Sequence, residues 1–290
     1  MKLSIQATGI SQPDNNKGYL EHAKFAANQC LEHSGVARDE IDLLINVGIY
    51  RDNNLCEPSV ASLIQHGLGI NLNPMKTPVK RPTLSFDIMN GAGGMLNALQ
   101  VAKAVLQAKQ LTRALLVSGD SHPSTKPASD FPITHAGAAL LVELSEEQGF
   151  DDFTFATTTT FDGQTGHLDL EKHGTQSRFS LQIDRTTDPE QMIGFTSDVI
   201  ERFLGKQKID KANVLLIISH PSPSFANVVS DKVGVALASC NATLLDWGDT
   251  HTANLALGAH LFFSQKAEQT DLLFVTVGVG LTVGCGLYRM

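Results

Sequence analysis

The chain has 290 residues, of which 42% are hydrophobic and 18% are charged, and its formal net charge is −8. This composition is that of an ordinary globular protein, long enough to bury a substantial core. The negative charge and the lack of a basic run argue against nucleic acid as a partner. No window approaches the roughly 18 apolar residues that a membrane span needs, so we expect no membrane association.

The amino terminus alternates like a strand and lacks the apolar block of a signal peptide, which predicts a cytoplasmic protein. The four cysteines are scattered, without the spacing of metal ligands (Cys30, Cys56, Cys240 and Cys285). We therefore expect reduced thiols and no metal site.

Apolar periodicity and turn residues predict alternating strands and helices in the first half of the chain. The expected strands are Leu3–Gly9, Ile41–Val47, Ser85–Met89, Ala114–Ser118 and Ala136–Glu143. The expected helices are Tyr19–Ser34, a helix opened by Glu57 and running through Leu68, and Leu96–Gln110. The continuous apolar run Ile41–Val47 is typical of a parallel sheet that is covered on both faces. Residues 150–185 are polar, and their strands are not placed by the pattern.

The second half repeats the order of a buried strand, a glycine turn, a helix of small residues and another strand. The expected helices are Ile193–Leu204, Ala226–Val235 and Thr252–Ser264, and the expected strands are Val214–Ser219 and Leu272–Val277. This repetition predicts an α/β fold made of two related βα halves, residues 1–165 and 166–290. We expect the halves to form one compact unit, with their boundary in the region 150–190.

The segment Met89–Met95, called the elbow below, joins a predicted strand to a predicted helix through three glycines. Such a turn often presents a nucleophile at a helix N-terminus, where the backbone N–H groups favour negative charge. Between the two methionines, however, the only side chains are the amide of Asn90 and the methyl of Ala92. Taken alone, these residues favour a structural turn without chemistry.

Several motifs, taken in order, resemble those of the thiolase-fold condensing enzymes, most of all the type III β-ketoacyl-acyl carrier protein synthases. Glu57–Ala61 resembles the family's "PSTA" helix, and Phe86–Gly94 resembles its "FDLNAACSGF" turn. His220 ends a strand as the family's catalytic histidine does, Gly248–Thr250 resembles its "GNTS" turn, and Gly278–Gly284 its "GAGLTWG" signature. The resemblance implies a layered α-β-α-β-α fold, acyl-thioester chemistry and no cofactor.

Three departures from the family pattern bear on this activity. The family's nucleophilic cysteine falls at Ala92, its asparagine falls at Asp249, and the segment reduced here to Gln12–Gly18 is about 30 residues longer in the family. The alanine cannot form a thioester, and an ionised aspartate only accepts hydrogen bonds. It would repel the enolate formed in the family reaction, so we do not expect condensation by this chain.

His220 is the one family catalytic residue that is retained in place. It is interpreted either as a general base oriented by Asp249, or as a structural histidine satisfied by the neighbouring backbone at a strand end. By resemblance, six further positions are candidates for lining the acyl pocket: Asn90, Gly91, Gly93, His251, Gly278 and Gly280.

Three functions follow as hypotheses. The first is a catalytically degenerate subunit, similar to the short Cys-less partner of alkylquinolone-forming synthases, in fatty-acyl or secondary-metabolite biosynthesis. It would pair with a Cys-bearing β-ketoacyl synthase-like subunit (a homodimer is the other possibility) and meet acyl-coenzyme A or acyl carrier protein through that partner. The second is a stand-alone acyltransferase, thioesterase or decarboxylase that uses His220 and Asp249 without a covalent acyl-enzyme. The third is a small-molecule binding protein that uses the former acyl cavity.

Overall fold

The fold comes from a computed structural model that describes residues 1–55, 57–72, 82–123, 131–159, 165–168, 181–184, 188–265, 270–278 and 280–290. Cys56 and most of the loop predicted between the second helix and the third strand lie outside these residues. The other three cysteines are buried and reduced.

A nine-stranded sheet runs through the molecule in the order β3-β2-β4-β5-β1-β6-β11-β10-β9. Its first half consists of β1 (Lys2–Ser11), β2 (Leu43–Asn46), β3 (Leu84–Asp87), β4 (Arg113–Asp120) and β5 (Ala136–Ser145). Its second half consists of β6 (Gly149–Thr157), β9 (Val214–Ile218), β10 (Asp271–Gly278) and β11 (Thr282–Arg289). The halves are joined where Leu3 of β1 pairs with Phe150 of β6. A separate antiparallel pair is formed by β7 (Thr165–Leu168) and β8 (Leu181–Asp184).

The described α-helices are α1 (Tyr19–Ser34), α2 (Val60–Leu68), α3 (Gly94–Lys109), α5 (Pro189–Gln207), α6 (Phe225–Val233), α7 (Cys240–Trp247) and α8 (Asn254–Ser264). Short 3₁₀ turns are η1 (Arg38–Glu40), η2 (Asp52–Asn54), η3 (Gly91–Gly93), η5 (Lys211–Asn213) and η6 (His251–Ala253). No described helix is both long and apolar enough to cross a membrane.

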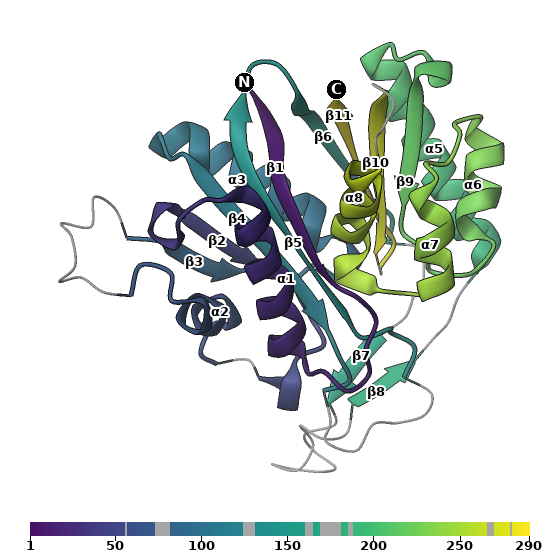
Figure 1. The fold of residues 1–290 in the computed structure, drawn as a ribbon. Coiled ribbons are helices and arrows are strands. Elements are labelled where there is room, and N and C mark those ends of the chain that lie inside the picture. The colour runs from purple at the N-terminus through teal and green to yellow at the C-terminus, as the bar shows by residue number, and fades with distance from the viewer. Residues whose placement is uncertain are drawn as a thin grey trace.

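The helices and the two half-sheets form five layers, as Figure 1 shows. Helices α1 and α2 cover the outer face of the first half-sheet, and their apolar residues form one core with it. Helices α3 and α8 lie between the half-sheets in the largest core. Helices α5 and α6 cover the outer face of the second half-sheet. The predicted α-β-α-β-α fold is confirmed.

The strands of the two halves follow the same order when each half-sheet is read outward from the β1–β6 junction. The second half lacks a full counterpart of β3, and residues 236–238 take its place beside β9. There Leu216 N–H donates to the carbonyl of Ala236 at 2.8 Å, and Ala238 N–H donates to the carbonyl of Leu216 at 2.9 Å. The side chain of Asn241 accepts from Ile218 N–H and donates to the carbonyl of Leu216, so it also closes this edge.

The division between halves at residues 165 and 166 stays a prediction, although β6 pairs with β11 and so lies with the second half-sheet. Every predicted helix and strand is present, with ends that shift by a few residues. Strands β6, β7 and β8 lie in or overlap the stretch whose strands were not placed, and α7 was not predicted. The sequence of β6 does contain a strand pattern, because the apolar residues Phe153 and Phe155 are two positions apart and both pack on the central core.

Asp87, at the end of β3, holds the start of α2 from outside that helix. Its carboxylate accepts from the N–H groups of Val60 at 2.9 Å and Ala61 at 2.8 Å, and from the amide of Asn46 at 3.0 Å. It also forms an ion pair of 3.2 Å with Arg51, whose side chain is only 4% exposed. The carboxylate therefore caps a helix and neutralises a buried guanidinium.

We expect Asp87→Ala to lower the free energy of unfolding by about 3–5 kcal/mol, since it leaves a buried charge and two helix N–H groups without an acceptor. Urea unfolding at pH 7 measures this loss. The matched control is Asp198→Ala on the exposed face of α5, expected to change stability by about 0.5 kcal/mol or less. Equal losses in the two variants would contradict the capping role.

Candidate functional site

The elbow has the strand–turn–helix form that the sequence predicts. Strand β3 ends at Asp87, the turn continues into η3, and α3 begins at Gly94. Gly91 has a φ of +50°, a left-handed conformation that glycine adopts without strain. Gly94 leaves little space, because a β-carbon there would lie 3.1 Å from Cβ of Val47. Ala92 is half-buried at the centre of this turn and supplies no nucleophile.

A second turn, η6, lies against the elbow and begins α8 as η3 begins α3. Its first residue, His251, has a φ of +46°, which matches Gly91 at the start of η3. A β-carbon placed on Gly91 would lie 3.5 Å from Nε2 of His251. The imidazole contributed by the second half therefore faces the elbow contributed by the first.

Asp120, at the end of β4, is fully buried beneath this histidine. Its Oδ2 lies 3.3 Å from Nδ1 of His251 and accepts from the N–H (3.0 Å) and hydroxyl (2.5 Å) of Thr252. Its Oδ1 accepts from the N–H groups of Ile49 at 3.1 Å and Tyr50 at 2.9 Å. One carboxylate thus fixes both the η6 turn and the loop after β2.

The two members of this pair shift each other's protonation. Burial alone would lower the pKa of His251, but the charges of Asp120 and Asp249 and the hydrogen bond to Asp120 hold it above its ordinary value. Burial would raise the pKa of Asp120, but His251 and the hydrogen bonds from Thr252 and Tyr50 hold it below its ordinary value. Each member of the pair thus favours the charged form of the other.

The predicted pair of His220 and Asp249 is not hydrogen-bonded in the structure. His220 is 5% exposed, and neither of its ring nitrogens has a hydrogen-bond partner among the residues that the structure describes. Burial lowers its pKa, and the nearby side chain of Asn241 offsets this in part. The expected backbone partners of a purely structural histidine are also missing, so both interpretations of His220 stay predictions.

Asp249 instead supports the second turn, because its Oδ1 accepts from His251 N–H at 2.9 Å. Of the predicted pocket residues, Gly91, Gly93, His251 and Gly278 come together at the elbow; a β-carbon on Gly278 would lie 3.9 Å from Gly93 N. Asn90 points along α3 to Asn97, while Gly280 borders open space. Within the described ranges, no group of three histidine, cysteine or acidic side chains could hold a metal.

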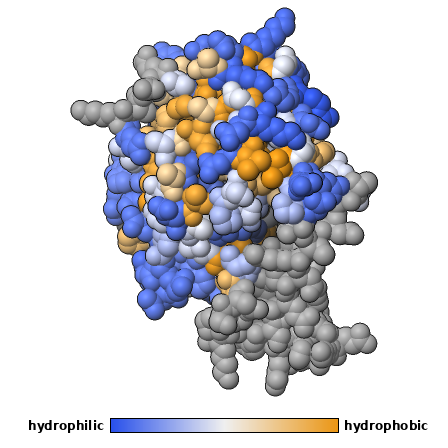
Figure 2. All heavy atoms as spheres, turned by 90° about the vertical axis from the view of Figure 1, so that its right-hand side faces the viewer, coloured by the Kyte–Doolittle hydropathy of each residue, from blue (hydrophilic) through white to orange (hydrophobic). Residues whose placement is uncertain are grey.

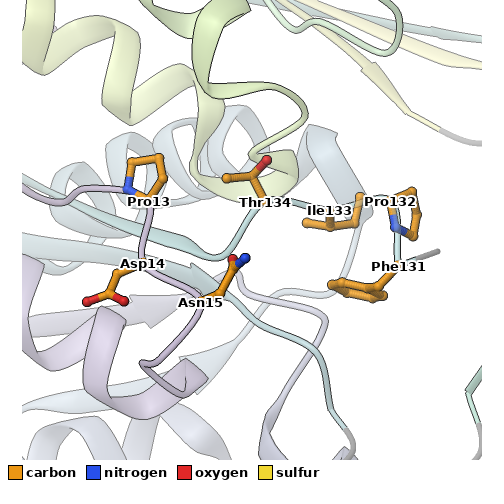
Figure 3. Close-up of a pocket in the computed structure, with 7 residues that line it drawn as sticks. All are labelled: Pro13, Asp14, Asn15, Phe131, Pro132, Ile133 and Thr134. Carbon is orange, nitrogen blue, oxygen red and sulfur yellow. The ribbon is translucent and has the colours of Figure 1, made fainter. Parts of the chain in front are cut away.

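A pocket of about 350 Å³ lies beside the short segment between β1 and α1. In Figure 3, Pro13, Asp14 and Asn15 lie on one side of this pocket and the loop Phe131–Thr134 lies on the other, with the amide of Asn15 directed toward the loop. Thr134 N–H donates to the carbonyl of Asp249 at 2.8 Å, so a residue that lines this pocket is hydrogen-bonded to the segment of the second turn. The ring of Phe131 packs edge-on against Tyr50, whose ring in turn lies 5.1 Å from that of His251.

The pairing of His251 with Asp120 was missed at the sequence level, although His251 was among the candidates. The two residues are separated by 131 positions, so no local spacing connects them. The available signal was positional: Asp120 directly follows a buried strand, and His251 falls in the turn that repeats the elbow.

No family model matches the chain. Among curated proteins, it is 24% identical to the β-ketoacyl-acyl carrier protein synthase III of Streptococcus thermophilus over 98% of this chain and 87% of that protein. It is 26% identical to the enzyme of the same name from Rickettsia bellii over 97% of this chain and 88% of that protein.

Solved structures of the same class superpose along the whole chain. The 3-oxoacyl-acyl carrier protein synthase III of Aquifex aeolicus matches with a TM-score of 0.78 and 17% identity, over 99% of this chain and 100% of that one. Xanthomonas campestris OleA with bound lauric acid and lauroyl-CoA matches with a TM-score of 0.79 and 13% identity, over 100% and 99%.

Proposed function

The chain has the thiolase-like fold of the type III β-ketoacyl synthases, and we propose that it is a non-condensing subunit that pairs with a Cys-bearing synthase of that type. The observation that carries the proposal is the elbow, where Ala92 stands at the nucleophile's position. The partner would supply the thiolate and meet the acyl-coenzyme A or acyl carrier protein substrates, in a cytoplasmic complex of fatty-acyl or secondary-metabolite biosynthesis.

An open strand edge next to the elbow supports the pairing. Strand β3 is the outermost strand at the left of Figure 1, and β2 is its only partner among the described residues. The N–H groups of Leu84 and Ile88 point to β2. By the alternation of a strand, those of Ser85 and Asp87 point away from β2, toward the side on which a second chain would pair.

The side chains around this edge are apolar and exposed. Leu84 is 53% exposed and Met89 is 59% exposed. Natural edge strands often carry lysine, proline or a bulge that prevents association; the four residues of β3 include no lysine or proline, and their pairing with β2 has no bulge. The opposite side of the molecule, around α6, mixes polar and apolar groups, as Figure 2 shows, and its sheet edge is closed by residues 236–241.

The experiment is to capture the tagged chain from its native host and to weigh the assembly by native mass spectrometry. The expected result is a one-to-one complex with a larger chain that carries the elbow cysteine. A homodimer of about twice the chain's own 31.2 kDa would overturn the obligate-partner proposal.

We expect Leu84→Lys to dissociate the complex, because it places a charge on the edge that the partner strand would cover. Val228→Lys on α6 is the matched control, since Val228 is also an exposed apolar residue, at 41%. Size-exclusion chromatography of the co-expressed proteins measures the loss, expected to be about 100-fold in affinity for a buried unpaired charge. Dissociation by the α6 variant alone would place the interface on the other face.

A further inference from the structure

His251 and Asp120 form a catalytic arrangement that the proposed subunit role does not use. The carboxylate is fully buried and the histidine side chain is 12% exposed. In a neutral imidazole, the contact with Asp120 places the proton on Nδ1, which leaves Nε2 as a proton acceptor. That nitrogen lies 3.5 Å from the point that a β-carbon on Gly91 would occupy, and Gly91 precedes the position of the lost nucleophile.

The backbone of His251 supports a functional interpretation. Its φ of +46° is uncommon for a residue with a side chain, and such conformations persist where the surroundings impose them. Here Asp249 holds the backbone N–H, Asp120 holds the ring, and Tyr50 packs on the ring face. Residues from three segments of the chain, around positions 50, 120 and 250, thus fix one imidazole over the elbow.

The elbow carries only small side chains, which leaves space beside this base for a small nucleophile. Gly91 and Ala92 are only half-buried, and neither carries a side chain larger than a methyl group. The N-terminus of the 16-residue helix α3 lies behind them, and its dipole favours the negative charge that develops on an acyl oxygen. A base facing such a site activates water in place of the missing thiol.

We propose that His251, oriented by Asp120, is the general base of a thioester hydrolase site at the elbow. Nε2 takes a proton from water as the water oxygen forms a bond to the thioester carbonyl carbon. The carbon–sulfur bond then breaks, and the departing thiolate takes the proton back from Nε2. The products are a carboxylic acid and a free thiol, and no acyl-enzyme is formed.

The test is thiol release from acetyl-, octanoyl- and lauroyl-coenzyme A by the protein in the assembly in which it purifies. We expect His251→Gln to lower kcat about 100-fold or more with little change in KM, the usual contribution of a general base. His66→Gln, at an exposed position on α2, is the control and is expected to keep full activity. Because the base must be neutral, kcat of the unsubstituted chain is expected to rise with pH through a pKa above the ordinary histidine value.

Hydrolysis that persists in His251→Gln, or an acyl adduct on this chain itself in intact-mass spectra, would overturn the proposal. So would the absence of thiol release from all three thioesters. These outcomes are independent of the subunit role. A heterodimer that does not hydrolyse thioesters would refute only this site, and a hydrolysing homodimer would refute only the pairing.

Discussion

We expect the Ala92→Cys variant to bind about one acyl group covalently, whereas the unsubstituted chain binds none. We expect no condensing activity from this variant. The new thiol would stand at the start of α3, where the helix N-terminus lowers a thiol pKa and so raises the fraction of reactive thiolate. Intact-mass spectrometry after incubation with octanoyl-coenzyme A measures the acylation.

Condensation should remain absent from this variant because Asp249 still occupies the asparagine position. An ionised carboxylate repels the enolate that forms when a malonyl thioester loses carbon dioxide, whereas an amide N–H would stabilise it. Ala92→Val is the control, since its side chain offers no nucleophile, and no adduct is expected. If Ala92→Cys alone gave a condensed product, the view of Asp249 as an obstacle would be wrong.

Asp120→Ala is expected to destabilise the protein by about 5 kcal/mol, the upper part of the range for breaking a buried charged network. The substitution removes the acceptor of three backbone N–H groups, one hydroxyl and one imidazole, all in the interior. Urea unfolding measures the loss, with Asp246→Ala on the exposed side of α7 as the control. A loss no larger than that of the control would contradict the bracing role of the carboxylate.

The contribution of this pair to the free energy of unfolding should also depend on pH, in a direction set by the pKa shifts of Asp120 and His251. The folded pKa of Asp120 is below 3.8, so its stabilisation is present above about that pH and is lost as the pH falls through the folded pKa. The folded pKa of His251 is above 6.5, so its stabilisation is complete below about that pH and is lost as the pH rises through the folded pKa. The difference in free energy of unfolding between the unsubstituted chain and His251→Gln is therefore expected to be largest between these two pH values and to become smaller at alkaline pH.

The layered fold was predictable because its signals are local. Buried parallel strands such as Ile41–Val47 appear as continuous apolar runs, and Gly35 and Gly69 end helices where the sequence indicates. The elbow was predictable for the same reason, since three glycines between a strand and a helix leave few other conformations. The absence of a nucleophile at Ala92 also follows from the sequence alone.

The contacts within the site were not predictable in the same way. His220 and Asp249 stand in family-like positions, but a hydrogen bond depends on the direction of side chains at distant points of the fold, and these two do not form one. Asp120 meets His251 only because β4 ends beneath the η6 turn. The open edge of β3 likewise became evident only from the order of strands in the sheet.

The closure of the β9 edge by residues 236–238 and Asn241 limits how far this protein can grow by strand addition. A sheet with two open edges can take up a neighbour on each side, and such chains can stack into filaments without end. Among the residues that the structure describes, this sheet has one open edge, at β3, so a single strand-to-strand contact uses it up. Assembly of two copies of this chain by this route therefore stops at the dimer.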